Sequence, residues 1–217
     1  MSNQIQAVIW DLDGVIIDSA DAHRRAWHRL AREEGLPFTD EQFWATFGWR
    51  NDAIIPTLWG PMSTDRVIEM ANRKEAYFRE FVREEVAPLP GAMELLSALH
   101  DAGYRQALAS STPIENINLI SDVLGLKRYL SVLVSGETVP RGKPAPDIFL
   151  KAAAELGVEP AKSLVIEDAV AGVEAAHAGG MRCIAVLHNR DLAGLRAANL
   201  AVNELPEVTV ERIRELA

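Results

Sequence analysis

Residues 5–14 read Ile-Gln-Ala-Val-Ile-Trp-Asp-Leu-Asp-Gly, a short apolar run that stops at two carboxylates. An apolar run of this length, bounded by a polar turn, is typical of a strand buried within a parallel sheet. In extended backbone, residues two apart face the same way, so Asp11 and Asp13 share one small site. Carboxylates that close are costly unless a cation lies between them or one is protonated. The alternative is a solvated acidic turn.

The C-terminal part of the chain alternates short apolar runs with helical patterns. Helices are predicted over 92–102, 114–124, 145–156 and 169–178, and strands over 104–109, 131–134, 162–166 and 182–187. Together with the strand over 5–10, this alternation predicts an α/β fold whose core is a Rossmann-like parallel sheet with right-handed crossovers.

The segment between the first strand and Pro88 has a different pattern, because no convincing strand interrupts it. Apolar residues recur at three- and four-residue spacing over 20–35, and helix-prone stretches follow over 40–46, 51–58 and 63–85. We therefore predict a discontinuous α/β core formed by residues 1–16 and 88–217, with an all-helical domain inserted at 17–87.

Composition excludes several classes of protein. The chain has 217 residues and a formal net charge of −9, which argues against a nucleic-acid or anionic-membrane surface. No apolar run approaches the ~20 residues of a membrane span, and the N-terminus lacks the layout of a signal peptide. Cys183, the single cysteine, has no partner for an internal disulfide and is predicted to be a buried, inert thiol. We expect a cytoplasmic protein, monomeric by default, without nucleic-acid or membrane partners.

Four polar clusters follow predicted strands, and the carboxyl ends of parallel strands meet at the edge where ligands bind. Each cluster alone has an ordinary explanation, such as a helix N-cap or a surface lysine. Their convergence at one edge is the stronger observation. The clusters are Asp11 with Asp13, Ser110 with Ser111, Lys143 between Gly142 and Pro144, and Glu167 with Asp168.

These residue types suit phosphate chemistry assisted by a hard cation. Carboxylate oxygens at this density suit Mg²⁺, which is typically completed by a substrate phosphate. Ser110 and Ser111 offer hydroxyl and N–H groups at a helix start, a generic phosphate cradle. Lys143 supplies a point charge that neutralises a phosphate or screens a nucleophile. An EF-hand is excluded, because Gly14 falls at the wrong loop position and no closing Glu follows.

Taken together, the clusters resemble the four motifs of the haloacid dehalogenase superfamily, over essentially the whole chain. Within it, the chain resembles the branch that holds β-phosphoglucomutase and its phosphatase relatives. The helical insertion stands where this family carries a small cap, which implies a lid that closes over the active site and selects the substrate. The matching segments are Asp11-Leu12-Asp13-Gly14-Val15, Ser110, Lys143 in Gly-Lys-Pro-Ala-Pro-Asp, and Glu167-Asp168 with Ala171-Gly172.

The resemblance implies a role for each core residue. Asp11 would be the nucleophile that forms an aspartyl-phosphate, and Asp13 the acid and then the base. An Asp at position 13 favours phosphoryl transfer over dehalogenation. Mg²⁺ would be held by the Asp11 carboxylate, the Asp13 backbone carbonyl and Asp168, with Glu167 nearby. The phosphoryl oxygens would be held by Ser110, Ser111, Lys143 and the backbone of Leu12 and Gly14.

Substrate-contacting residues are expected in the helical insertion. His23 matches the histidine of the mutase branch, with a helix-surface position as the alternative. Arg50 would clamp a second phosphate or a carboxylate, but it is displaced by one position from the mutase Gly-x-Ser-Arg, and the Ser is missing. Arg79 stands near a mutase lysine, and Trp49 is a sugar-stacking or packing residue. Further candidates are Trp27, Gly48 and Asn51.

Three functional hypotheses follow. The first is a Mg²⁺-dependent phosphatase for a small phosphorylated metabolite, such as a sugar phosphate. The second is a phosphohexomutase, in which the aspartyl-phosphate passes its phosphoryl group to a sugar hydroxyl instead of water. The third, a catalytically silent phosphate-binding module, has no support because the complete set of motif residues is present.

Overall fold

The structure, a computed structural model, describes residues 4–188 and 193–216 and divides into two compact units. The first unit combines Met1–Asp18 with Ala87–Ala217, and the second is the continuous segment Ser19–Val86, compared with the predicted insertion at 17–87. No described helix is both long and apolar enough to cross a membrane.

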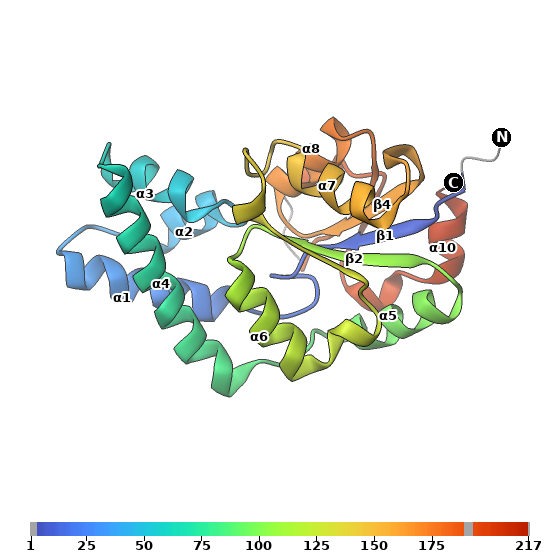
Figure 1. Ribbon diagram of the computed structural model, residues 1–217, viewed down its shortest axis with the longest axis horizontal. Helices are drawn as coiled ribbons and strands as arrows, with labels where there is room; N and C mark the ends of the chain where they lie inside the picture. Colours follow the sequence, from blue (N-terminus) through green and yellow to red (C-terminus); the bar gives the residue numbers. More distant parts are fainter. Residues whose placement is uncertain (1–3, 189–192, 217) are drawn as a thin grey trace. The chain divides into compact units, whose positions relative to one another are not determined.

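The first unit is built on a parallel sheet with the strand order β3-β2-β1-β4-β5-β6 among the described residues. The central strand β1 (Ala7–Trp10) lies between β2 (Arg105–Ser110) and β4 (Ser163–Glu167), as Figure 1 shows. The sheet continues through β3 (Val132–Ser135) on one side and through β5 (Arg182–Val186) and β6 (Leu200–Val202) on the other. Because all pairs are parallel, the carboxyl ends of β1, β2 and β4 meet at one edge. This confirms the predicted Rossmann-like α/β class.

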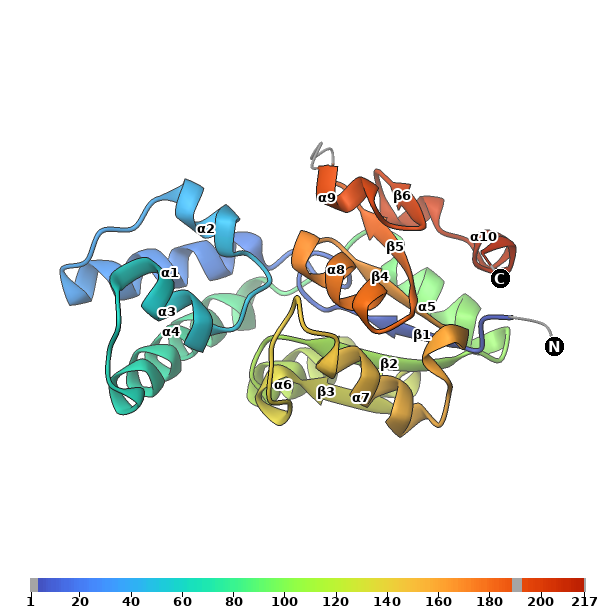
Figure 2. The same ribbon diagram turned by 90° about the horizontal axis from the view of Figure 1, so that it is seen from above.

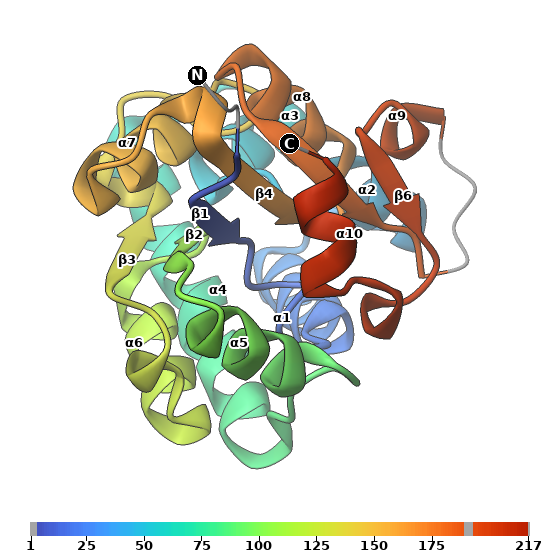
Figure 3. The ribbon, with the colours of Figure 1, turned by 90° about the vertical axis from the view of Figure 1, so that its right-hand side faces the viewer.

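Helices cover both faces of the sheet (Figure 3). On one face, α7 packs on β1, β2 and β3, and α8 packs on β4 and β5. On the other face, α5 packs on β2, α6 packs on β3, and α10 contacts α5. The helices of this unit are α5 (Ala92–Asp101), α6 (Ile114–Leu124), α7 (Asp147–Leu156), α8 (Val170–Ala178), α9 (Ala193–Arg196) and α10 (Val210–Glu215). Short 3-10 helices cover Leu126–Arg128, Gly136–Thr138, Pro160–Lys162 and Leu205–Glu207.

The central strand is apolar throughout because both of its faces are buried. Alternate side chains point to opposite faces of a strand, and Ile9 packs in the same cluster as Phe149 of α7 and Val173 of α8. Trp10 points to the other face and is fully buried. Its indole Nε1 donates to Gln106 Oε1 at 3.0 Å, so burial leaves no unsatisfied donor.

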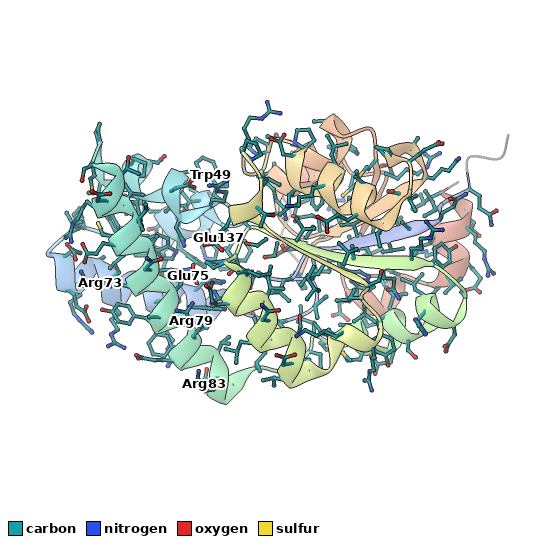
Figure 4. The ribbon with its side chains drawn as sticks, in the orientation of Figure 1. Trp49, Arg73, Glu75, Arg79, Arg83 and Glu137 are labelled. Atoms are coloured by element: carbon teal, nitrogen blue, oxygen red, sulfur yellow. The ribbon has the colours of Figure 1, made fainter. Side chains whose placement is uncertain are left out.

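The second unit consists of four helices around a core of its own. The long helix α4 (Thr64–Glu85) packs along α1 (Ala20–Glu34), and α2 (Asp40–Thr46) and α3 (Asn51–Trp59) complete the unit (Figure 2). Outside the core, Arg73 on α4 is ion-paired with Glu33 and Glu34 of α1 (Figure 4). The core side chains are Trp27, Leu30, Phe43, Ile54, Ile55 and Met70.

Three elements near the C-terminus were not predicted from the sequence, namely β6, α9 and α10. β6 has three residues, too few to show the alternation of a strand, and α9 has four, too few to show the periodicity of a helix. α10 has six residues and is capped by Thr209, whose side chain accepts the Arg212 N–H. Such short elements depend on packing against their neighbours rather than on local pattern.

Candidate active site

The turn after β1 is closed by its own backbone. Asp11 donates its N–H to the Ile166 carbonyl at 3.0 Å, which ties the end of β1 to β4. The Leu12 carbonyl accepts the N–H groups of Ile16 and Ile17. Gly14 has φ +79°, a conformation that L side chains rarely adopt, and a Cβ there would lie 2.1 Å from Asp168 Oδ2. The Asp11–Gly14 turn therefore requires glycine at its fourth position.

Lys143 joins carboxylates from two different strand ends. Its Nζ donates to Asp11 Oδ1 and to Glu167 Oε1, each at 2.6 Å. All three side chains are buried. A buried lysine between two carboxylates is a strong charge-assisted contact, so Lys143 holds the ends of β1 and β4 in one cluster.

The second acidic pair follows β4. Glu167 is 1% exposed, and its Oε2 accepts the N–H groups of Asp168 and Ala169, each at 2.7 Å. Gly172 in the first turn of α8 makes room for this carboxylate, because a Cβ there would lie 1.8 Å from Glu167 Oε1. The glycine that follows the acidic pair in sequence is thus required by the position of Glu167.

The acidic cluster carries more negative charge than Lys143 alone neutralises. Burial raises the pKa of Asp11, and Glu167 and Asp13 raise it further, so that it lies well above its usual value although Lys143 lowers it. Burial lowers the pKa of Lys143, but Asp11 and Glu167 raise it more. Carboxylate oxygens of Asp11, Glu167 and Asp168 lie within 4.8 Å of one another. Hard oxygen donors in this number fit Mg²⁺.

Ser110 ends β2 beside the first turn. Its Oγ donates to Asp13 Oδ2 at 3.4 Å and accepts the N–H of Thr112 at 3.2 Å. Asp13 is only half-buried, unlike Asp11. The second aspartate and the serine therefore lie together, while Lys143 is bonded to the first aspartate.

The polar turn after β2 is supported by a segment that sequence analysis did not single out. Ser135 Oγ donates to the Thr112 carbonyl at 2.9 Å, and the Ile114 N–H at the start of α6 donates to Glu137 at 3.1 Å. A Cβ on Gly136 would lie 2.9 Å from the Ser111 carbonyl oxygen. The first amide of α6 is thus occupied by a carboxylate and is not available to a phosphate, so the predicted phosphate cradle is limited to Ser110 and Ser111.

In the helical unit, His23 belongs to a buried polar network rather than to the helix surface. Lys74 Nζ lies 2.6 Å from His23 Nδ1 and donates to Glu75 Oε1 at 2.9 Å. Asn51 Nδ2 donates to the same Glu75 oxygen at 2.7 Å. The His23 ring stacks on Phe78 with centroids 3.8 Å apart. Lys74 and Glu75 were missed because an Arg-Lys-Glu run in a helix is usually a solvated face.

Other predicted substrate residues of the helical unit are Arg50, Trp49 and Arg79, of which Figure 4 labels Trp49 and Arg79. Arg50 forms two hydrogen bonds with Asp52, at 3.1 and 2.5 Å. Trp49 packs against the aromatic core of the unit, which favours the packing interpretation. Arg79 is half-buried on α4, one helical turn after Glu75.

Comparisons with known proteins give matches over most of the chain. A family model described as haloacid dehalogenase-like hydrolase matches residues 5–180. A phosphorylated carbohydrates phosphatase of Thermotoga maritima is 31% identical over 219 residues, covering 98% of this chain and 100% of that protein. The chloroplastic 5-amino-6-(5-phospho-D-ribitylamino)uracil phosphatase of Arabidopsis thaliana is 32% identical over 212 residues; the match covers 96% of this chain and 57% of that relative. A β-phosphoglucomutase structure from Clostridium difficile superposes with a TM-score of 0.89 at 27% identity, covering 98% and 97% of the two chains.

Proposed function

This chain belongs to the haloacid dehalogenase-like hydrolase family, and we propose that it is a Mg²⁺-dependent phosphatase for a small phosphorylated metabolite, a sugar phosphate. The observation that carries the proposal is a contact at the carboxyl ends of β1 and β4. There, Lys143 Nζ lies 2.6 Å from Asp11 Oδ1 and 2.6 Å from Glu167 Oε1. Asp13 and Ser110 lie together at the adjacent end of β2.

The reaction proceeds in two steps that use the two aspartates differently. The Asp11 carboxylate attacks phosphorus, the ester P–O bond breaks, and Asp13 gives its proton to the leaving oxygen. Water then attacks the aspartyl-phosphate while Asp13 takes the proton of the water, which releases inorganic phosphate and restores Asp11. Asp13 is half-buried, which is compatible with exchange of its proton with solvent. Asp11 is buried, and the positive charge of Lys143 partly neutralises its carboxylate.

The charge of the phosphoryl group needs partners beyond Lys143. Asp11, Glu167 and Asp168 offer the buried oxygen donors that would hold Mg²⁺. When bound, Mg²⁺ neutralises charge on the transferring phosphoryl group. Ser110 and Ser111, at the neighbouring carboxyl end of β2, hold phosphoryl oxygens and are supported by the Ser135–Glu137 turn.

Selection of the substrate's non-phosphate part is assigned to the helical unit, which we propose is the family's cap. Its buried His23–Lys74–Glu75 network supports this assignment, because buried polar groups of fixed geometry discriminate hydroxyl patterns well. The phosphatase named for phosphorylated carbohydrates in Thermotoga maritima supports a sugar-phosphate substrate. Similarity to the β-phosphoglucomutase of Clostridium difficile supports a phosphohexomutase as the second candidate.

Phosphorus NMR with Mg²⁺, β-glucose 1-phosphate and a trace of glucose 1,6-bisphosphate separates the two candidates, followed by a panel of sugar phosphates. Release of inorganic phosphate supports the phosphatase, and conversion to glucose 6-phosphate supports the mutase. Asp11→Asn is expected to abolish turnover with an unchanged circular dichroism spectrum. Asp101→Asn, at the exposed end of α5, is the matched control. Turnover retained by Asp11→Asn would overturn the mechanism.

A further inference from the structure

His188, two residues after β5, adopts a backbone conformation that is unusual for its side chain. Its φ is +48°, and it is the only non-glycine residue with positive φ among residues 4–188 and 193–216. L residues other than Asn, Asp and His rarely occupy this left-handed region, and a glycine would occupy it freely. Outliers of this kind persist where the surroundings hold them, and they gather at functional sites.

The surroundings hold His188 through both its backbone and its ring. The N–H groups of Leu187 and His188 donate to the carbonyls of Val202 and Asn203, at 2.8 and 3.0 Å. Nε2 of the ring lies 2.6 Å from the Gly14 carbonyl oxygen. Because a carbonyl only accepts, Nε2 carries the proton, so this hydrogen bond forms in both the neutral and the protonated imidazole.

The bond reaches the turn that carries both aspartates. Gly14 follows Asp13 directly, and the Gly14 α-carbon already lies against the Asp168 carboxylate. The Gly14 N–H donates to the Ile17 carbonyl at 2.8 Å. His188 therefore adds a fixed contact to the Gly14–Val15 peptide, which begins one residue after Asp13, from a position 174 residues away in sequence.

We propose that His188 is a positioning residue, whose Nε2–H···O bond to Gly14 fixes the Asp11–Gly14 turn and thereby holds Asp13 at its working position beside Ser110. The proposal rests on the proposed phosphatase function. It also explains why the left-handed position is occupied by histidine although glycine fits that backbone better: the imidazole is retained for its donor.

Two substitutions separate this role from a merely structural one. His188→Gly removes the donor but relieves the backbone, so Tm is expected to stay equal or rise while kcat falls about 10- to 100-fold, the loss typical of a misplaced catalytic group. His188→Gln places an amide donor near the Nε2 position but keeps the unfavourable φ, so Tm is expected to fall while most of kcat is retained. KM should change little in either variant, because Asp13 acts on the leaving oxygen rather than on binding.

The assay uses the sugar phosphate that the wild-type chain hydrolyses fastest, with Mg²⁺, because its sugar alkoxide needs the Asp13 proton to leave. Calorimetry gives Tm. His177→Ala, an exposed imidazole on α8, is the matched control and should match the wild type. The carbonyl ¹³C resonance of Gly14 reports the bond without any turnover and should shift in His188→Gly but much less in His188→Gln. Wild-type kcat in His188→Gly, equal losses in both variants, or an unmoved Gly14 resonance would overturn the proposal. Hydrolysis by the wild-type chain tests the phosphatase function separately.

Discussion

Glu167 is the most constrained side chain of the site, and Gly172 is the residue that leaves room for it. One carboxylate oxygen accepts from Lys143, and the other accepts two backbone N–H groups after β4. The backbone of the first turn of α8 closes the remaining side. A small displacement of this carboxylate would therefore also displace Lys143 and, through it, Asp11.

We predict that Gly172→Ala disrupts this cluster. A Cβ 1.8 Å from Glu167 Oε1 forces the carboxylate away from Lys143, and breaking a buried ion pair costs about 3–5 kcal/mol. The free energy of unfolding, measured in urea, and kcat should both fall. Gly179→Ala, at the other end of α8, is the matched control: its φ is −80° and its nearest contact 3.3 Å, so its change should stay within about 1 kcal/mol. Equal effects of the two substitutions would contradict the argument.

The buried thiol of Cys183 provides a second prediction. The thiol is fully buried in β5, and burial, together with the charge of Glu167, raises its pKa. Because the thiolate is the reactive form, a thiol reagent should leave the native protein unmodified at pH 8 and label it stoichiometrically in denaturant. Mass spectrometry before and after urea addition measures this, and rapid labelling of the native chain would show that β5 opens.

Helix α4 contains two adjacent charges that the core of the helical unit encloses. Lys74 is 2% exposed and Glu75 is 3% exposed. Burial raises the pKa of Glu75, but Lys74, His23 and the Asn51 hydrogen bond together lower it, and the net shift is below the usual 4.5. The carboxylate is therefore ionised in the fold at pH values where the unfolded chain has begun to bind a proton.

This shift predicts how the stability of the helical unit depends on pH. The contribution of Glu75 is complete above its unfolded pKa near 4.5 and is lost as pH falls through the lower folded pKa. Glu75→Gln should cost about 3 kcal/mol at pH 7, because Lys74 loses its charged partner, and the difference from wild type should narrow below pH 4.5. Urea unfolding followed by tryptophan fluorescence measures this, since four of the five tryptophans, at 27, 44, 49 and 59, lie in this unit. A constant difference across pH would refute it.

For the molecule as a whole, local sequence predicted what depends on local pattern. The buried strand before Asp11 follows from its apolar run, and the proximity of Asp11 and Glu167 follows from the parallel pairing of β1 with β4. Lys143 lies in the loop after β3, and it was singled out by its position between Gly142 and Pro144. Conversely, the contact of Lys74 with His23 joins residues 51 apart, and that of His188 with Gly14 joins residues 174 apart. Such contacts cannot be predicted from the periodicity of apolar residues, because they depend on how helices and loops pack against one another.

The charge balance of the first unit predicts that it binds a divalent cation. Its buried carboxylates face one lysine, so a divalent cation should bind the folded chain and not the unfolded one. At 100 times its Kd, such a ligand adds about 2.7 kcal/mol to the free energy of unfolding, so Mg²⁺ should raise Tm. Asp168→Asn removes one donor and should abolish most of that rise, whereas Asp101→Asn, exposed at the end of α5, should keep it. NaCl at matched ionic strength corrects for screening. An equal rise in both variants would place the bound Mg²⁺ away from Asp168.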